Sequence, residues 1–157
     1  MENRDIARLL GEVADLLEIQ DKGVNPFRVR SYRLASESIL ATGADVAALV
    51  RQGGDLRATL EVGEGLAAKV REIVLTGESS DRRKLLEEVP EGLLELLRIP
   101  GLGPKSVGKI WKGLGVRSAD ELAQAIREGR FRALPGMGAK KEETVRRGLE
   151  RLRPPPR

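Results

Sequence analysis

The chain has 157 residues, of which 40% are hydrophobic and 33% are charged, a balance typical of globular proteins with room for one domain or two small ones. It contains no cysteine and no histidine, which excludes disulfides and thiolate metal sites and disfavours zinc chemistry and serine- or cysteine-based hydrolysis. No apolar run approaches the roughly 20 residues that span a bilayer, and the N-terminus lacks the features of a signal peptide. We therefore expect a cytoplasmic protein that does not associate with membranes.

The net charge of +4 is unevenly distributed along the chain. Residues 1–80 hold 10 Lys and Arg against 13 Asp and Glu, whereas residues 81–157 hold 18 against 11. Because duplex DNA presents a dense row of negative phosphates, the basic half is the better candidate for binding it.

Apolar residues at helical spacing predict an all-helical protein, and no segment alternates long enough with the period of two expected of a strand. The first predicted helix covers 6–17. Asn25 followed by Pro26 predicts the N-cap and first position of a second helix. Ser118 and Glu121 form the pattern of a capping box ahead of a helix near the C-terminus. Further helices are expected at 46–51, 66–75, 82–88 and 119–128.

An internal repeat is the most informative feature of the chain. The sequence IPGLGPKSV at 99–107 recurs 35 positions later as LPGMGAKKE at 134–142, and a weaker copy, LEVGEGLAA, lies at 60–68. Each copy precedes a predicted helix. A period of this length also occurs in tetratricopeptide solenoids, but the core of proline, glycine, an apolar residue and glycine does not belong to that pattern.

The two strong copies have the chemistry of a phosphate-binding turn. Glycines permit a tight turn, and the free N–H groups and dipole at the start of the following helix hold an anion without reading a base. Lysines follow each turn, and Lys112 shares a helix face with two of them. The alternative is that the turns only join packed helices and the lysines form a solvated face; the duplication favours DNA. The predicted DNA-contacting residues are Gly101, Gly103, Lys105, Lys109, Gly136, Gly138, Lys140 and Lys141.

This repeat resembles the helix-hairpin-helix superfamily, whose turns contact DNA phosphates, often with a monovalent cation held by hairpin carbonyls. More narrowly, the segments 25–35, 65–70 and 89–103 resemble the N-terminal part of bacterial family X DNA polymerases, and this resemblance covers essentially the whole chain. In that family the part carries a lyase-type domain and hairpin elements ahead of a catalytic palm. The chain has no Asp-x-Asp pair to hold two catalytic metals, so we expect neither nucleotide transfer nor a required cofactor.

The resemblance assigns Lys69 to the lysine that, in that family, forms a Schiff base with a 5′-deoxyribose phosphate before β-elimination. Such a lysine must lose its proton near neutral pH, which partial burial promotes, and Lys69 lies at the border of the apolar face of its predicted helix. Arg28 is assigned to a 5′-phosphate pocket and Tyr32 to an aromatic position near the nucleophile. The alternatives are a surface lysine with its stem along apolar neighbours, a surface arginine and a core tyrosine.

The first hairpin departs from the family pattern. Glu61 replaces a glycine, Leu60 replaces a proline, and Glu64 adds negative charge to the turn. Gly65 and Ala68 stand where some relatives have lysine and glutamate. These changes weaken the expected phosphate contact at the first hairpin, in agreement with the acidic balance of this half.

The sequence therefore predicts a lyase-like helical domain at 1–80 with a degenerate first hairpin, a tandem helix-hairpin-helix domain at 81–153 and a tail at 154–157. Three functions stay open. The first is sequence-independent binding of duplex, gapped or nicked DNA, in DNA repair. The second adds lyase chemistry at Lys69, in base excision repair. The third is a protein-interaction module that recruits repair proteins. Two origins are also open, a stand-alone relative or a piece of a longer polymerase, as is the oligomeric state.

Overall fold

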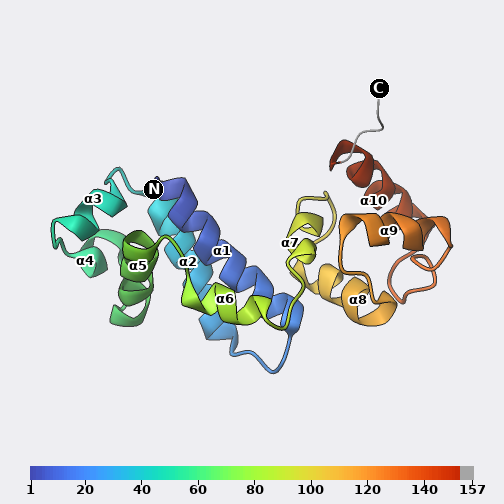
Figure 1. Cartoon of the computed structure of the whole chain (residues 1–157), viewed down its shortest axis with the longest axis horizontal. Coiled ribbons are helices and arrows are strands. Elements are labelled where there is room, and N and C mark those ends of the chain that lie inside the picture. Colours follow the sequence, from blue (N-terminus) through green and yellow to red (C-terminus); the bar gives the residue numbers. More distant parts are fainter. Residues whose placement is uncertain (153–157) are drawn as a thin grey trace. The chain divides into compact units, whose positions relative to one another are not determined.

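The computed structural model describes residues 1–152, and within them the chain forms ten α-helices and no strand, which confirms the all-helical fold class (Figure 1). The predicted tail at 154–157 lies outside the described residues. No helix within residues 1–152 is long and apolar enough to cross a membrane. The helices are α1 (Asn3–Gln20), α2 (Pro26–Ala41), α3 (Val46–Arg51), α4 (Leu56–Leu60), α5 (Glu64–Thr76), α6 (Ser80–Leu86), α7 (Gly92–Leu96), α8 (Pro104–Leu114), α9 (Ala119–Arg127) and α10 (Ala139–Leu152).

The chain divides into two compact units. The first unit comprises residues 1–17 and 22–87, and the second comprises residues 18–21 and 88–157. Helices α2 to α6 therefore belong to the first unit and α7 to α10 to the second, while the last turn of α1 belongs with the second.

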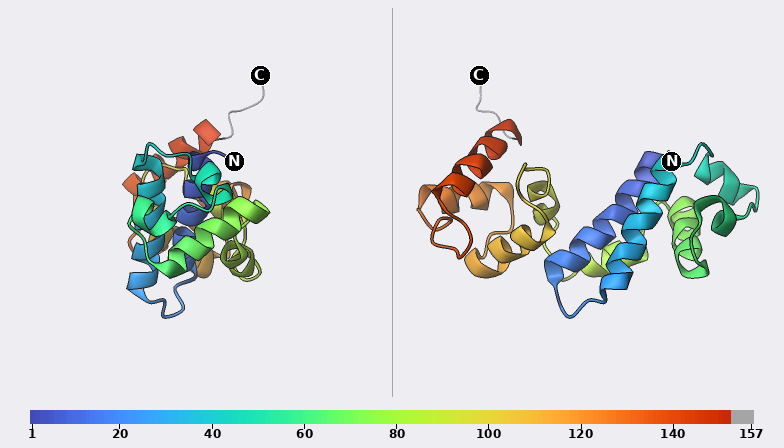
Figure 2. Two further views of the ribbon diagram at one scale, coloured as in Figure 1. Left: turned by 90° about the vertical axis from the view of Figure 1, so that its left-hand side faces the viewer. Right: turned by 180° about the vertical axis from the view of Figure 1, so that it is seen from behind.

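The first unit is built on the antiparallel pair α1 and α2, which lie side by side in each ribbon view (Figure 2). The Oγ of Ser36 donates to the carbonyl of Ala7 at 2.7 Å, and Arg33 forms an ion pair with Asp15 at 3.1 Å. The predicted start of α2 is confirmed, since the Asn25 side chain accepts a hydrogen bond from a backbone N–H in the first turn and Pro26 follows it. Apolar residues of both helices are fully buried between them and their neighbours.

Two short helices, α3 and α4, precede the first hairpin turn in the chain. Asp45 and Asp55 cap them, each accepting a backbone N–H at 3.2 Å. The sequence pattern predicts α3 with its observed bounds but not α4, because five residues are too few to show a helical period.

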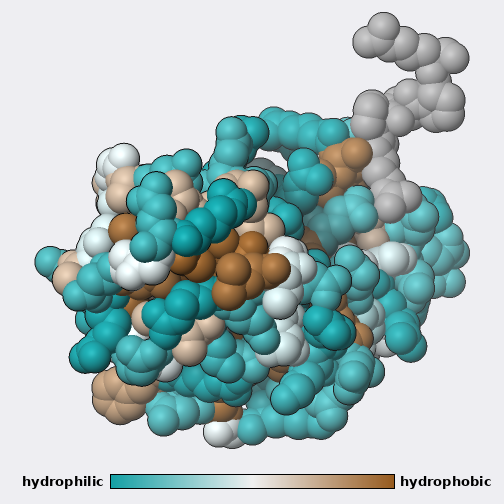
Figure 3. Space-filling view, turned by 60° about the vertical axis from the view of Figure 1, so that its left-hand side comes forward, coloured by the Kyte–Doolittle hydropathy of each residue, from teal (hydrophilic) through white to brown (hydrophobic). Residues whose placement is uncertain are grey.

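Large apolar side chains also reach the surface of the first unit. Phe27 is 77% exposed, and Leu34, Leu40 and Leu75 are exposed as well. Apolar surface is visible among hydrophilic atoms in the space-filling view (Figure 3). Exposed apolar residues of this number are ordinary on a folded protein and assign no function by themselves.

The second unit packs its helices around Phe131, which is fully buried although no helix contains it. Several glycines of this unit, among them Gly108 and Gly148, allow close packing that a Cβ would prevent. A Cβ at Gly148 of α10 would lie 2.6 Å from Cγ2 of Ile99, and a Cβ at Gly108 of α8 would lie 2.9 Å from the carbonyl oxygen of Ile19. The predicted connecting helix is confirmed as α9, whose cap Ser118 accepts a hydrogen bond from the third helical residue at 3.2 Å.

Candidate functional site: hairpin turns and a lysine cluster

The three hairpin turns share one backbone feature. Glu61, Gly101 and Gly136 occupy the equivalent position in the three copies, and their φ angles are 55°, 91° and 83°. These values lie in the left-handed region that glycine adopts readily and that side chains disfavour. The first hairpin therefore keeps the turn of the other two with a residue that is strained in it.

Each strong hairpin ends on a glycine that begins a helix. Gly103 is the N-cap of α8 and supplies no side-chain hydrogen bond to the first turn, and Pro104 has no N–H. The N–H groups of the next two residues are therefore the donors at this end of the helix. Gly138 precedes α10 in the same way, and its carbonyl accepts the N–H of Glu142 at 3.0 Å. Both helix ends have the donors and the dipole that favour an anion.

The lysines near these turns differ in their surroundings. Lys105, Lys109 and Lys140 are exposed, and within residues 1–152 no carboxylate pairs with them. Lys141 instead donates a hydrogen bond to the carbonyl of Gly101, so its ammonium links α10 to the preceding hairpin. Lys112 donates to the carbonyl of Gln20 at 2.7 Å. Of the predicted DNA-contacting lysines, three are therefore available to a phosphate and Lys141 is held within the protein.

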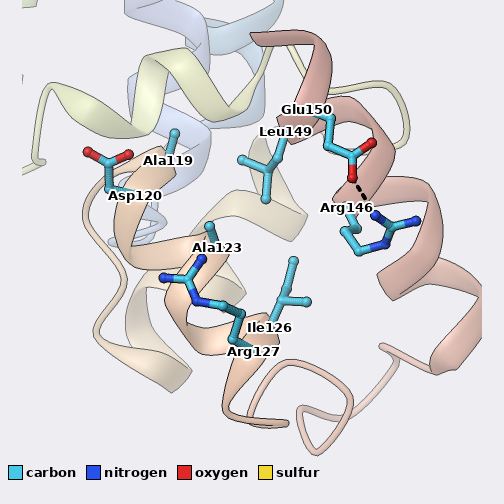
Figure 4. A pocket seen from close by; sticks show the side chains of 8 residues that line it. All are labelled: Ala119, Asp120, Ala123, Ile126, Arg127, Arg146, Leu149 and Glu150. Carbon is cyan, nitrogen blue, oxygen red and sulfur yellow. Dashed lines mark hydrogen bonds and ion pairs between the residues drawn. The ribbon is translucent and has the colours of Figure 1, made fainter. Parts of the chain in front are cut away.

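Two arginines of α10, Arg146 and Arg147, are paired with acidic neighbours. Arg146 pairs with Glu143 at 2.6 Å and with Glu150, and Arg147 pairs with Glu143 at 3.1 Å. The hydrogen bond from Arg146 is the largest cause that lowers the pKa of Glu143 to about 2. Figure 4 shows Arg146 turned to Glu150 beside a hollow between α9 and α10. These guanidinium groups add less to DNA attraction than their number in the sequence indicates.

The first hairpin has the opposite electrostatic character. Glu64 at the start of α5 pairs with Arg71 at 2.6 Å and with Arg57 at 4.0 Å, and Glu61 lies in the turn itself. Two carboxylates therefore stand where a phosphate would have to approach. The arginines offset part of the charge of Glu64, so the weakened phosphate contact at the first hairpin stays a prediction.

A cluster of four polar side chains lies elsewhere in the first unit. The Nζ of Lys69 on α5 lies 2.8 Å from Oδ2 of Asp81 on α6. Tyr32 on α2 donates its hydroxyl to the same Oδ2, and Arg28, one turn earlier on α2, lies 3.9 Å from Oδ1. The three residues that the resemblance assigned to a lyase site thus converge on one carboxylate, which the sequence analysis did not single out.

Local structure holds Asp81 in place. Ser79 is buried and caps α6, accepting the N–H of Arg82 at 3.2 Å. The N–H of Ser80 donates to Oε1 of Glu72 on α5 at 3.0 Å, and this hydrogen bond lowers the pKa of Glu72. The first turn of α6 is therefore fixed against α5, directly beside Lys69.

The protonation states of the cluster follow from burial and charge. Burial acts to raise the pKa of Asp81, but the hydrogen bonds from Lys69 and Tyr32 and the charges of Lys69 and Arg28 outweigh it, so this pKa lies below its usual value. Burial is also the largest cause of a raised pKa at Tyr32, followed by the hydrogen bond to Asp81. At neutral pH, Asp81 is a carboxylate and Tyr32 is a neutral donor to it.

The four side chains of the cluster differ in their exposure to solvent. Tyr32 is buried, which agrees with the core position that its spacing predicts, whereas its hydroxyl reaches the cluster. The side chains of Lys69 and Arg28 are 39% and 48% exposed, and that of Asp81 is 12% exposed. Lys69 and Arg28 can therefore be reached from solvent. Within residues 1–152, no group of three His, Cys, Asp or Glu residues is arranged to hold a metal ion.

Comparison with known proteins agrees with this structure. Residues 1–79 match a family described as helix-hairpin-helix domain, and residues 93–151 match one described as SAM-like helix-hairpin-helix tandem. The chain is also 35% identical over 149 residues to the DNA polymerase/3′-5′ exonuclease PolX of Bacillus subtilis (strain 168), which covers 95% of this chain and 25% of that protein. The chain thus spans about a quarter of the length of this relative.

Proposed function

Because this chain belongs to the helix-hairpin-helix family, we propose that it binds the phosphate backbone of DNA through its second and third hairpins. One observation carries the proposal: exposed lysines that no described carboxylate neutralises stand directly after two hairpin turns whose helix ends offer free N–H groups. The relative from Bacillus subtilis, named a DNA polymerase and exonuclease, supports DNA as the polyanion.

Binding of this kind has two consequences. Phosphates carry no base information, so affinity is the same for different sequences of equal length and form. Each phosphate contact releases counterions, so affinity falls steeply as the salt concentration rises. The proposed contacts are Lys105, Lys109 and Lys140 together with the turns at 101–103 and 136–138.

The direct test is fluorescence anisotropy with labelled duplex, nicked and gapped DNA over a series of salt concentrations. We expect binding to each form, no preference between unrelated sequences, and a linear fall of the logarithm of affinity with the logarithm of salt, with a slope of about −3 if the three lysines each contact one phosphate. An affinity that does not change with salt, or no binding at low salt, would contradict the proposal and favour a protein-interaction module.

A bound cation is a separate question at the hairpin carbonyls. The oxygen of Gly101 already accepts a hydrogen bond from the ammonium of Lys141. A cation at that oxygen would lie beside the positive charge of Lys141, and no step of the proposed binding passes through a cation.

A second candidate function is removal of a 5′-deoxyribose phosphate by Lys69. The cluster in the first unit supports it, because Lys69 is reachable from solvent and Arg28 lies close enough to the same carboxylate to hold the 5′-phosphate of a bound sugar beside the amine. In this reaction the amine attacks the sugar aldehyde to form a Schiff base, and β-elimination then frees the strand.

Borohydride reduction tests the lyase directly, because it converts a Schiff base into a stable adduct. The substrate is a gapped duplex with a 5′-deoxyribose phosphate. We expect a covalent adduct with the wild-type protein, none with Lys69→Ala, and an unchanged adduct with the control Lys84→Ala, which removes an exposed lysine of α6. Absence of an adduct with the wild-type protein would leave DNA binding as the function of the chain.

A further inference from the structure

The position of Asp81 raises a chemical question that the lyase proposal leaves open. A Schiff base lyase has to remove a proton from a carbon of the sugar, and this step needs an acceptor close to the lysine nitrogen. The chain contains no histidine. Without histidine, a carboxylate close to the lysine nitrogen is the acceptor that we consider first.

Among the described residues, one carboxylate lies in contact with the lysine nitrogen. Oδ2 of Asp81 lies 2.8 Å from Nζ of Lys69, while Glu72 on the same helix as Lys69 is engaged with the N–H of Ser80 at 3.0 Å. Tyr32 donates its proton to Asp81 and therefore cannot be the acceptor in this arrangement.

We propose that Asp81 is the general base of the lyase reaction and accepts the C2′ proton of the sugar from the Schiff base on Lys69. The inference rests on the proposed lyase function. C2′ is two bonds from Nζ once the Schiff base has formed, so a carboxylate in contact with Nζ is within reach of the hydrogens on C2′.

The lyase reaction at Lys69 proceeds in three steps. Nζ of Lys69 bonds to C1′ of the aldehyde, and one water molecule leaves, which gives a protonated imine. Oδ2 of Asp81 takes the proton from C2′, the electrons of that C–H bond form the C2′–C3′ double bond, and the C3′–O bond breaks, so its electron pair leaves with the phosphate of the downstream strand. Water then adds to C1′ and frees the amine of Lys69, and Asp81 returns its proton to solvent.

The surroundings of Asp81 suit this role. The hydroxyl of Tyr32 and the first turn of α6 hold the carboxylate in one orientation, and only 12% of its side chain is exposed. Arg28 lies 3.9 Å from the other oxygen, so a 5′-phosphate held by Arg28 places the sugar next to Oδ2. The carboxylate carries its charge at neutral pH, so its oxygens can accept a proton, and its contact with Lys69 rather than its lowered pKa supports the role.

The test is Asp81→Asn in the full chain, because asparagine keeps the size of the side chain and an oxygen that accepts from Tyr32 but cannot take a proton. The substrate is again the gapped duplex with a 5′-deoxyribose phosphate, and two quantities are measured: the borohydride-trapped adduct and the released strand. We expect the rate of strand release to fall by at least about a hundredfold while the adduct still forms and accumulates.

Two control variants and the wild-type protein separate the possible outcomes. Asp81→Glu retains a carboxylate and should restore part of the release rate, and Glu78→Gln, an exposed carboxylate paired with Arg83, should change neither quantity. Two results would overturn the role of Asp81 while leaving the lyase intact. In the first, Asp81→Asn loses adduct and strand release equally and Asp81→Glu does not rescue them. In the second, strand release is unchanged in Asp81→Asn. Absence of an adduct with the wild-type protein would instead refute the lyase itself and this inference with it.

Discussion

The first hairpin and the two hairpins of the second unit have the same turn and different chemistry. Glu61, Gly101 and Gly136 all adopt the left-handed conformation. Around the first turn lie two carboxylates, Glu61 and Glu64, of which Glu64 is paired with arginines, whereas exposed lysines without described carboxylate partners follow the other two. We therefore expect that the turn shape alone is insufficient for a phosphate site and that net positive charge after the turn is the second requirement.

The two units also differ in the chemistry that their charged groups suit. The second unit presents cations that are unneutralised and exposed, as an electrostatic contact requires. The first unit presents Lys69 in contact with a single, nearly buried carboxylate, an arrangement suited to moving protons rather than to gripping a polymer. We expect changes in the second unit to alter affinity and changes in the first to alter chemistry.

The largest expected effect is a loss of DNA affinity when the exposed lysines of the second unit are replaced. The double substitution Lys105→Glu with Lys140→Glu should lower DNA affinity by roughly a hundredfold at low salt and reduce the salt slope by about 2, because two phosphate contacts are lost and repulsion replaces them. Anisotropy titrations measure both quantities. Lys84→Glu in the first unit makes half of this change in charge and should change affinity by less than about twofold. A loss of about tenfold in Lys84→Glu would show that net charge, and not the hairpins, governs binding.

A second effect concerns the packing that holds the hairpins. Gly148→Ala should lower the free energy of unfolding by about 1–3 kcal/mol, because the added Cβ meets Cγ2 of Ile99 at 2.6 Å and α10 must move away from the second hairpin. Gly65→Ala beside the first hairpin meets no atom within 4 Å and should instead stabilise α5 by roughly 0.5–1 kcal/mol. Chemical denaturation of both variants measures the difference, and a destabilised Gly65→Ala would contradict the open surroundings of the first hairpin.

Local sequence patterns predicted most of the helices, but they could not predict contacts between residues that are distant in the sequence. Asn25 with Pro26 and Ser118 with Glu121 marked helix starts that the structure confirms, because a cap is a contact between near neighbours in sequence. The five-residue helices α4 and α7 were not predicted, since they are too short to show a period.

The candidate site was predictable only in part, for the same reason. The resemblance pointed to Lys69, but Asp81 comes from another helix and no local pattern connects the two residues. The hydrogen bond from Lys141 to Gly101 spans 40 positions, and the sequence presented Lys141 simply as one more lysine after a turn. Charge in a sequence can be counted, whereas its neutralisation by a distant partner requires the fold.

A third and smaller effect exchanges the residues at the equivalent turn position. Gly101→Ala should lower the free energy of unfolding by about 1–2 kcal/mol, because alanine is strained at a φ of 91°. Glu61→Gly should raise it by less than about 1 kcal/mol, since relief of the strain at a φ of 55° is partly offset by the greater freedom of glycine in the unfolded chain. Thermal and denaturant unfolding measure both changes. If Glu61→Gly were destabilising, the strain assigned to the first turn would be wrong.

The smallest expected effect is a change in how the free energy of unfolding of the first unit depends on pH. The pKa of Asp81 in the folded protein lies below its unfolded value, so its ionised form stabilises the fold. That contribution is fully present above the ordinary pKa of about 4 and is lost as the pH falls through the folded value. Asp81→Asn should therefore flatten the decline of the unfolding free energy between about pH 4 and pH 2, measured by urea denaturation at each pH. Glu64→Gln at the first hairpin removes a carboxylate whose side chain is 65% exposed and whose ion pairs are screened, so it should leave that decline nearly unchanged. An equal flattening in both variants would mean that the contact of Asp81 with Lys69 and Tyr32 is no stronger than a surface ion pair, and the proton chemistry assigned to the first unit would lose its structural basis.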